Sequence, residues 1–333
     1  MKSVSLYTSN FNMKNTNTEA NKIIKHTIGF SLLAILVIGG IEKSLSYLVS
    51  CSGNAQTGKV NLVMTHKIDP NLVIFGSSVA EVGFNSALIA KKLNKTVYNL
   101  ALDGTPILKS ECLIDEFLSY NKNCDTILIG LVYLCYSEME GINMPSRFLA
   151  HKSNKFVIEN FSIISPNLTK KLNYAPFYSF IVADQNYYKN AFIGLKNLIN
   201  DNKTPIDPKM GFLSNNAIYV DTRNSKSNLD TIHIIQKSID RQMKILSKIK
   251  SKGITPILVI TPMHINGQRS FVNFESYTNT AKKIALKTNT RIIDFSQSEI
   301  AKNNRYFYNN GHLNSLGARS FTLSLCDSLT NFN

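Results

Sequence analysis

The chain has 333 residues, and its 37 basic against 22 acidic side chains give a formal net charge of +15. A hydrophobic share of 44% and a charged share of 18% exclude a wholly disordered chain and fit a globular α/β protein. The positive charge favours an anionic neighbour such as acidic lipid or an envelope polymer. Nucleic acid is not expected, because the lysines are scattered and no nucleic-acid-binding motif accompanies them. The five cysteines lack CxxC spacing, so we expect no metal site, no cofactor and no disulfide framework, although one bridge stays open.

An uncharged apolar run lies near the amino terminus. It extends over Thr27–Ile41 and follows several lysines, a pattern typical of an export or anchoring signal whose basic flank stays in the cytoplasm. The run is shorter than the roughly 20 residues that cross a bilayer, but its flanks can extend a tilted helix. We therefore predict a cytoplasmic tail over 1–25, a single-pass anchor in the cytoplasmic membrane over 26–48, and a connector over 49–70. The rest of the chain would lie in the periplasm or at the cell surface.

Two other interpretations of this segment stay open. Leu48-Val49-Ser50-Cys51 looks like a lipoprotein processing site, with Cys51 as the lipid acceptor. Glu42 and Lys43 interrupt the apolar region where such a signal is uniformly apolar, which favours an uncleaved anchor. The remaining alternative is a buried helix of a soluble protein.

After the connector, short β-branched runs alternate with helical patterns, which predicts an α/β domain over 71–333 with a parallel sheet covered on both faces. The aromatic stripe that begins at Phe271, Phe274 and Tyr277 has helical spacing and is interpreted as core. The predicted strands are Leu72–Phe75, Thr96–Leu100, Thr126–Val132, Thr255–Thr261 and Thr290–Asp294. The predicted helices are Asn85–Leu93, Pro106–Tyr120, Leu229–Ser251, Ser270–Lys287 and Ser315–Leu329.

The alternation breaks over 137–228, where the chain is rich in Tyr, Phe, Asn and Lys and is punctuated by prolines. We interpret this segment as an insertion or a cap over the active edge of the sheet. Its aromatic side chains, such as Tyr174 and Tyr188, either line a sugar-binding cleft or form the core of the cap itself.

Two short motifs carry the chemistry. In Val73-Ile74-Phe75-Gly76-Ser77-Ser78 a buried strand leads directly into a serine turn, where a hydroxyl is exposed beside backbone N–H groups that can stabilise an oxyanion. Much later, Asn309-Asn310-Gly311-His312 forms a polar loop ahead of the last helix. Taken singly, Gly-Ser-Ser is common in tight turns, and a lone histidine before a helix is more often a capping or surface residue.

Together, and in this order, the two motifs resemble those of the SGNH (GDS-motif) hydrolase family, over roughly Asn71 to Leu329. The resemblance implies a three-layer, flavodoxin-like fold, with Ser78 as nucleophile, His312 as its base, and Ser77 in place of the usual aspartate. Gly-Ser-Ser followed by Gly83-Phe84-Asn85 is similar to the envelope branch that contains D-alanyl-lipoteichoic-acid and alginate O-acetylation proteins. Those relatives are typically anchored by one amino-terminal span.

Further family positions are assigned by the same resemblance. Gly104 takes the place of the oxyanion-hole glycine, although an ordinary turn glycine is the alternative. The third block, at Gly130–Tyr133, lacks the family's asparagine, so one oxyanion donor is missing or comes from elsewhere. His264 follows a predicted strand and is a candidate substrate contact, with an ordinary loop histidine as the alternative.

Asn309 occupies the position at which the family carries an aspartate. An amide oxygen can accept a hydrogen bond from the imidazole, but it cannot stabilise the imidazolium by charge. Three outcomes follow: another carboxylate such as Asp294 serves, although that residue fits a structural role better; a Ser–His pair is enough; or catalysis is lost and ligand binding is kept.

The resemblance implies O-acyl ester chemistry on an envelope glycan or lipid-linked sugar, either as an acyltransferase or as an esterase. Transfer is favoured, because anchored relatives work beside a membrane-bound O-acyltransferase. The alternative is an inactive SGNH-like module that binds glycan or acts as a scaffold in an envelope assembly complex.

Overall fold

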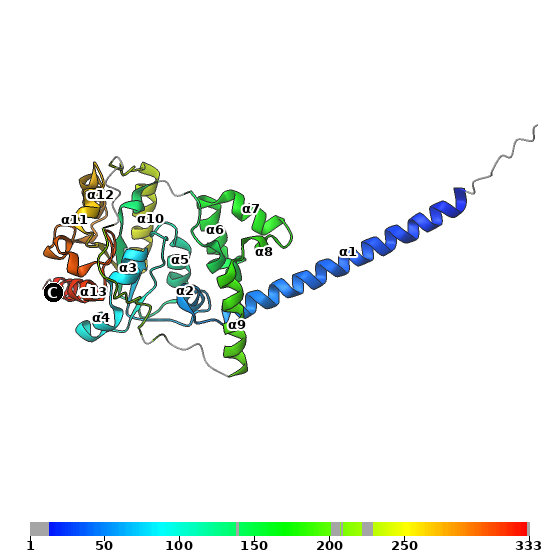
Figure 1. Ribbon diagram of the computed structural model, residues 1–333, viewed down its shortest axis with the longest axis horizontal. Helices are drawn as coiled ribbons and strands as arrows, with labels where there is room; N and C mark the ends of the chain where they lie inside the picture. The colour runs from blue at the N-terminus through cyan, green and yellow to red at the C-terminus, as the bar shows by residue number, and fades with distance from the viewer. Residues whose placement is uncertain (1–12, 138–139, 201–206, 208, 222–228, 332–333) are drawn as a thin grey trace, which may run out of the picture.

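The computed structural model describes residues 13–137, 140–200, 207, 209–221 and 229–331. Its first element is the long helix α1 (Met13–Ser50), which projects away from the rest of the molecule (Figure 1). The stretch Glu19–Ser50 is long and apolar enough to cross a membrane, and its apolar window is entirely unburied. The helix thus extends beyond the predicted 26–48, and residues 1–12 of the predicted tail lie outside the described part of the chain.

A five-stranded parallel sheet forms the centre of the molecule. Its strand order is β2-β1-β3-β4-β5, the flavodoxin-like order, in which the connection reverses direction between β1 and β3. The strands consist of β-branched and other apolar residues because both faces are covered, and four of the five have almost wholly buried side chains. Their bounds are β1 (Leu72–Gly76), β2 (Val97–Asn99), β3 (Thr126–Leu131), β4 (Thr255–Ile260) and β5 (Arg291–Asp294).

Two layers of helices cover the sheet and confirm the predicted three-layer α/β fold. Phe75, Ile129 and Leu258 point to one layer, and Ile74 and Leu128 to the other. The first layer contains α2 (Ala55–Met64), α5 (Glu111–Tyr120), α10 (Gln236–Ser251) and α12 (Phe274–Lys287). The second contains α3 (Ser78–Gly83), α4 (Ser86–Leu93) and α13 (Ser315–Thr330).

Helix α2 lies in the centre of the segment 49–70, which was predicted as a connector. Val60 and Val63 are fully buried in the core, and Asn61 donates hydrogen bonds to the carbonyl oxygens of Val49 and Ser52 at 2.7 and 2.8 Å. These contacts tie the end of α1 to the domain.

The segment predicted as an insertion is mainly helical, apart from 138–139, 201–206, 208 and 222–228, which lie outside the described residues. Its helical part packs beside α1 and α5 (Figure 1), whereas Tyr219 reaches the active edge of the sheet, where its hydroxyl donates to Oδ1 of Asn310 at 2.6 Å. Tyr174 is exposed, whereas Tyr187 packs in a small core with Val49 and Leu172. The helices are η2 (Pro145–His151), α6 (Lys155–Ile164), α7 (Pro166–Tyr174), α8 (Tyr178–Val182) and α9 (Gln185–Ile199).

Short helices complete the loops at the edges of the sheet. They are η1 (Tyr133–Tyr136), which follows β3, α11 (Ile265–Gln268), which follows β4, and η3 (Glu299–Lys302) and η4 (Asn304–Tyr306), which follow β5. The loops after β1, β3 and β4 therefore meet at the carboxyl edge beside the β1/β3 reversal, where ligands bind in open α/β sheets.

Candidate active site

Ser78 lies at the tight turn between β1 and α3. Gly76 has a φ of +154°, and a Cβ atom there would lie 2.6 Å from the Cβ of Ala80 and 2.8 Å from the carbonyl oxygen of Gly130. Only glycine fits this close approach of α3 to β3. Ser77 then precedes the helix as its N-cap, and Ser78 becomes the first helical residue, where backbone N–H groups have no partner within the helix.

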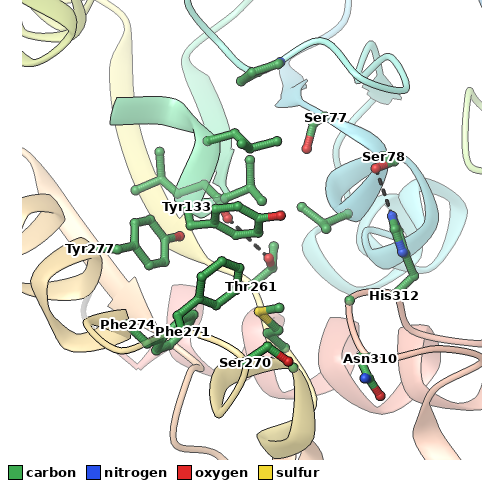
Figure 2. Close-up of a pocket in the computed structure, with 18 of the residues that line it drawn as sticks. Ser77, Ser78, Tyr133, Thr261, Ser270, Phe271, Phe274, Tyr277, Asn310 and His312 are labelled. Atoms are coloured by element: carbon green, nitrogen blue, oxygen red, sulfur yellow. Dashed lines mark hydrogen bonds between the residues drawn. The ribbon is translucent and has the colours of Figure 1, made fainter. Parts of the chain in front are cut away.

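His312 reaches this serine from 234 residues further along the chain. Its Nε2 lies 2.8 Å from the Oγ of Ser78, and the two side chains point toward one another in Figure 2. The histidine sits in the loop before α13, whose first turn is capped by Asn314. The structure therefore brings together the two residues that the sequence motifs singled out.

Asn309 orients the imidazole of His312. Its Oδ1 lies 3.0 Å from Nδ1 of the ring, and it also accepts hydrogen bonds from the backbone N–H groups of Gly311 and His312, both at 2.9 Å. Two converging donors hold the amide with its oxygen toward the ring. Nδ1 therefore carries the proton and donates a hydrogen bond to Oδ1 of Asn309. This leaves Nε2 free to accept a hydrogen bond from the hydroxyl of Ser78.

The surroundings keep this imidazole neutral. Burial lowers the pKa of His312 below its usual value of 6.5, and the carboxylate of Asp103 opposes that shift. Asp294 does not serve as the orienting carboxylate, because it forms an ion pair with Lys282 at 2.7 Å and accepts from the backbone N–H of Ser296. Asp294 thus has the structural role that the sequence favoured.

A cavity of about 340 Å³ opens beside the Ser–His pair. Ser77 and Gly104, which were predicted to bind substrate, both line it. Gly104 has a φ of +61°, a left-handed conformation that favours glycine, and a Cβ atom there would also displace the side chain of Asn143. Their contact with a substrate stays a prediction.

Apolar and aromatic residues follow β3, in the block where the resemblance implied an asparagine. Val132, Tyr133 and Leu134 line the cavity there. Phe271, Phe274 and Tyr277 lie on the same side as Tyr133 (Figure 2), and the ring centroids of Tyr133 and Phe271 are 4.6 Å apart. The helical spacing of Phe274 and Tyr277 predicts that they belong to the core. They are buried as expected, but they also line the cavity, which helical spacing alone cannot reveal.

The expectation that His264 contacts substrate is corrected by its position. The residue is 1% exposed and does not line the cavity. Its Nδ1 accepts from the N–H of Asn266, and its Nε2 lies 2.7 Å from Oδ1 of Asn304. Its backbone N–H donates to the carbonyl oxygen of Asn310, so His264 supports the loop that carries His312.

A buried ion pair fixes α3 from behind. Glu81, one turn after Ser78, lies 2.9 Å from Nζ of Lys59 on α2, and the two side chains are 4% and 6% exposed. The same ammonium donates to the carbonyl oxygen of Ala101, in the loop that leads to Gly104. Asn99 on β2 donates to the carbonyl oxygens of Ala80 and Phe84 at the other end of α3. The serine turn and the glycine loop are thus tied to one another.

Comparison with known proteins gives distant structural likenesses. No family model matches the chain, and neither does any curated protein. Among the solved structures that match are a proposed platelet activating factor from Streptococcus pneumoniae, with 12% identity, a TM-score of 0.42, and coverage of 91% of this chain and 99% of that one. An acetyl xylan esterase has 13% identity, a TM-score of 0.39, and coverage of 78% and 99%. A proposed acylhydrolase from Bacteroides fragilis has 10% identity, a TM-score of 0.40, and coverage of 80% and 92%.

The fold and the site together define an α/β protein of flavodoxin-like strand order, with a hydrogen-bonded Ser–His pair at the carboxyl edge of its sheet. These features, rather than the distant likenesses, are the basis for a functional argument. The arrangement provides a hydroxyl, a neutral base in the correct tautomer, and a cavity next to both, which suits nucleophilic attack on an acyl group.

Proposed function

We propose that this protein is a serine-dependent acyl esterase or O-acyltransferase. One observation carries the proposal: Nε2 of His312 lies 2.8 Å from Oγ of Ser78 while its Nδ1 is held by Asn309. Nucleophile, base and orienting group thus stand in the relation that acyl transfer through a covalent intermediate requires.

The proposed reaction has two halves. Oγ of Ser78 attacks the acyl carbonyl, its proton passes to Nε2 of His312, and backbone N–H groups of Ser78 and Gly104 stabilise the oxyanion. The carbon–oxygen bond to the leaving alcohol breaks, and His312 returns the proton to that alcohol. An acceptor hydroxyl or water, deprotonated by His312, then attacks the acyl-serine, and the serine regains its proton as the acyl group leaves.

We further propose that the reaction takes place outside the cytoplasmic membrane, with α1 as an uncleaved anchor. Basic residues before the apolar run support this orientation. Cleavage before Cys51 would remove Val49, which is 0% exposed and packs against Leu172 and Tyr187. That packing favours the anchor over the lipoprotein.

An envelope glycan or a lipid-linked sugar is the proposed acceptor or substrate. A formal charge of +15 and an anchor near the membrane fit an anionic envelope polymer. A membrane-bound O-acyltransferase that supplies acyl groups is the proposed partner, by the resemblance to anchored envelope proteins.

Asn309 supports a second candidate, an inactive module that binds glycan or scaffolds an assembly complex. Without a carboxylate, the imidazolium formed during attack lacks a charged partner in direct contact. The short Ser78–His312 hydrogen bond favours the enzyme over this alternative.

Hydrolysis of a chromogenic ester by the full chain in detergent micelles tests the proposal. The Ser78→Ala variant should lose at least about 10³-fold in kcat, because removing a nucleophile leaves only binding and oxyanion stabilisation. Ser324→Ala, an exposed serine on α13, is the matched control and should keep wild-type activity. Equal rates for wild type and Ser78→Ala would favour the inactive module.

A further inference from the structure

The cavity beside Ser78 is largely apolar. Four aromatic side chains, Tyr133, Phe271, Phe274 and Tyr277, form one side of it and are called the aromatic wall below. The ring centroids are 4.6 Å apart for Tyr133 and Phe271, 6.5 Å for Phe271 and Phe274, and 5.6 Å for Phe274 and Tyr277, so the wall is continuous. In Figure 2 the wall and the Ser78–His312 pair lie on opposite sides of the pocket.

The cavity also lacks formal charge. Among the described residues that line it there is no Asp, Glu, Lys or Arg, and burial favours the neutral form of His312. A charged acyl group, such as an aminoacyl group with its ammonium, would contact no charged side chain of the lining and would lose its hydration at a large desolvation cost. The lining therefore selects for an uncharged acyl group.

The volume argues for more than two carbons. About 340 Å³ lies in the range of small-molecule pockets, and an acetyl group would leave most of the aromatic wall without contact. We propose that Ser78 accepts an uncharged, apolar acyl chain longer than acetyl, whose tail packs against the aromatic wall. This inference rests on the proposed function and names its acyl group.

A chain-length series of 4-nitrophenyl esters, from acetate to octanoate, tests it on the full chain in detergent micelles. Each methylene that enters the apolar cavity should raise kcat/KM about fourfold until the cavity is full. A preference for acetate, or equal rates along the series, would overturn the proposal.

Phe271→Ala opens the wall at a half-buried position, and Val272→Ala, an exposed neighbour that does not line the cavity, is its control. Phe271→Ala should lower kcat/KM for hexanoate about tenfold and change acetate by less than about twofold. If kcat/KM does not change along the ester series while a fluorophosphonate still labels Ser78, only the proposed acyl chain is overturned. If Ser78 is not labelled, the proposed function is overturned as well.

A different observation concerns helix α9. Tyr188, Phe192, Leu195 and Ile199 recur at helical spacing along one side of it, and they are 40 to 73% exposed. This set is called the apolar stripe. Such a row of exposed large side chains on one helix marks an interaction site.

The other side of α9 crosses the end of α1. The hydroxyls of Tyr187 and Ser46 are 3.1 Å apart, and the side chain of Asn197 donates to the carbonyl oxygen of Cys51 at 3.0 Å. Between them, a Cβ at Gly194 would lie only 1.8 Å from the carbonyl oxygen of Leu48. Residues along much of α9 thus contact only the last few residues of α1 and Cys51. The two helices therefore cross where α1 leaves the domain (Figure 1).

If α1 spans a bilayer, α9 lies at the membrane surface. An exposed apolar stripe with Lys189 and Lys196 beside it has the composition of an interfacial helix, whose lysines meet anionic headgroups. We propose that the occupant of the apolar stripe is the lipid bilayer surface, which would hold the domain against the membrane.

The chain contains no tryptophan, so a single introduced tryptophan reports on this contact. We compare Phe192→Trp with Leu286→Trp, an 84% exposed position on α12 at the opposite end of the domain, in nanodiscs with and without brominated lipid. Bromine should quench the fluorescence of Phe192→Trp and leave that of Leu286→Trp unchanged. Equal emission of Phe192→Trp in both lipids would overturn the proposal. A blue shift without quenching would indicate a protein occupant and would overturn it too.

Discussion

At the scale of single residues, the chemistry depends on how much Asn309 retains of what an aspartate provides. It retains the orientation, because two backbone N–H donors turn its oxygen toward the ring of His312. It does not retain the charge. In a serine protease, an Asp→Asn change leaves the histidine in the wrong tautomer. That defect is avoided here, and only the negative charge of the carboxylate is missing.

The pH dependence of the reaction follows from the environment of His312. Its pKa is lowered by burial, and only the neutral ring can act as the base. As pH falls, kcat/KM should therefore decline with a midpoint below the usual 6.5. Values of kcat/KM for ester hydrolysis in detergent micelles, measured across acidic pH values, check this expectation. A midpoint above 6.5 would contradict it.

Replacing Asn309 by aspartate should supply the missing charge. A hydrogen bond to a charged group is stronger than a neutral one by about 1 to 1.5 kcal/mol, so kcat/KM at its plateau should rise about tenfold. The carboxylate also favours the imidazolium, so the acidic midpoint should move to higher pH. Steady-state kinetics of Asn309→Asp measure both effects, with Asn309→Ala as the control that loses orientation. A lower plateau for Asn309→Asp would count against this geometry.

Some residues of the site could be predicted from the sequence, and others could not. Ser78 and His312 were found because each sits in a local motif at an element boundary, and the structure brings the two together. The aromatic wall was not found, because Phe274 and Tyr277 follow the same helical spacing whether they face only core or also a cavity. His264 was placed at the correct edge but given the wrong role, since its burial depends on contacts with Asn304 and Asn310 that only folding creates.

At the scale of elements, the strands were predicted to within one residue at every end, because buried parallel strands need continuous apolar runs. Helix α2 was missed, since its first turns read Ala-Gln-Thr-Gly-Lys and show no apolar face. Its buried Lys59 is stable only beside Glu81, which lies on a different element. The insertion's helices were not resolved by the sequence either, and their apolar faces are divided between α1 and the domain.

The end of α1 should contribute to the stability of the domain. A chain that begins at residue 55 lacks Leu45, Leu48 and Val49, which pack with Leu172 and Tyr187, whereas a chain that begins at residue 39 keeps them. Loss of that apolar burial should lower the free energy of unfolding by about 3 kcal/mol or more. Urea unfolding followed by circular dichroism compares the two chains, and equal midpoints would show that α1 is only a tether.

At the scale of the whole molecule, an α/β domain is joined to a helix that is long and apolar enough to cross a membrane, through the packed helices of the insertion (Figure 1). The Ser–His pair lies at the carboxyl edge of the sheet beside the β1/β3 reversal. Strand order follows from the alternating pattern in the sequence, whereas the position of the insertion beside α1 depends on long-range packing. The proposed bilayer contact of α9 would fix the distance from the active site to the membrane.

The central claim is that Ser78 is a nucleophile activated by His312. Labelling of the full chain in detergent micelles with a fluorophosphonate, followed by mass spectrometry of the peptide that contains Ser78, tests it most directly. We expect covalent labelling of Ser78 in the wild type, much slower labelling in His312→Ala and none in Ser78→Ala. A wild-type chain that stays unlabelled under all conditions, or labelling that persists in Ser78→Ala, would contradict it.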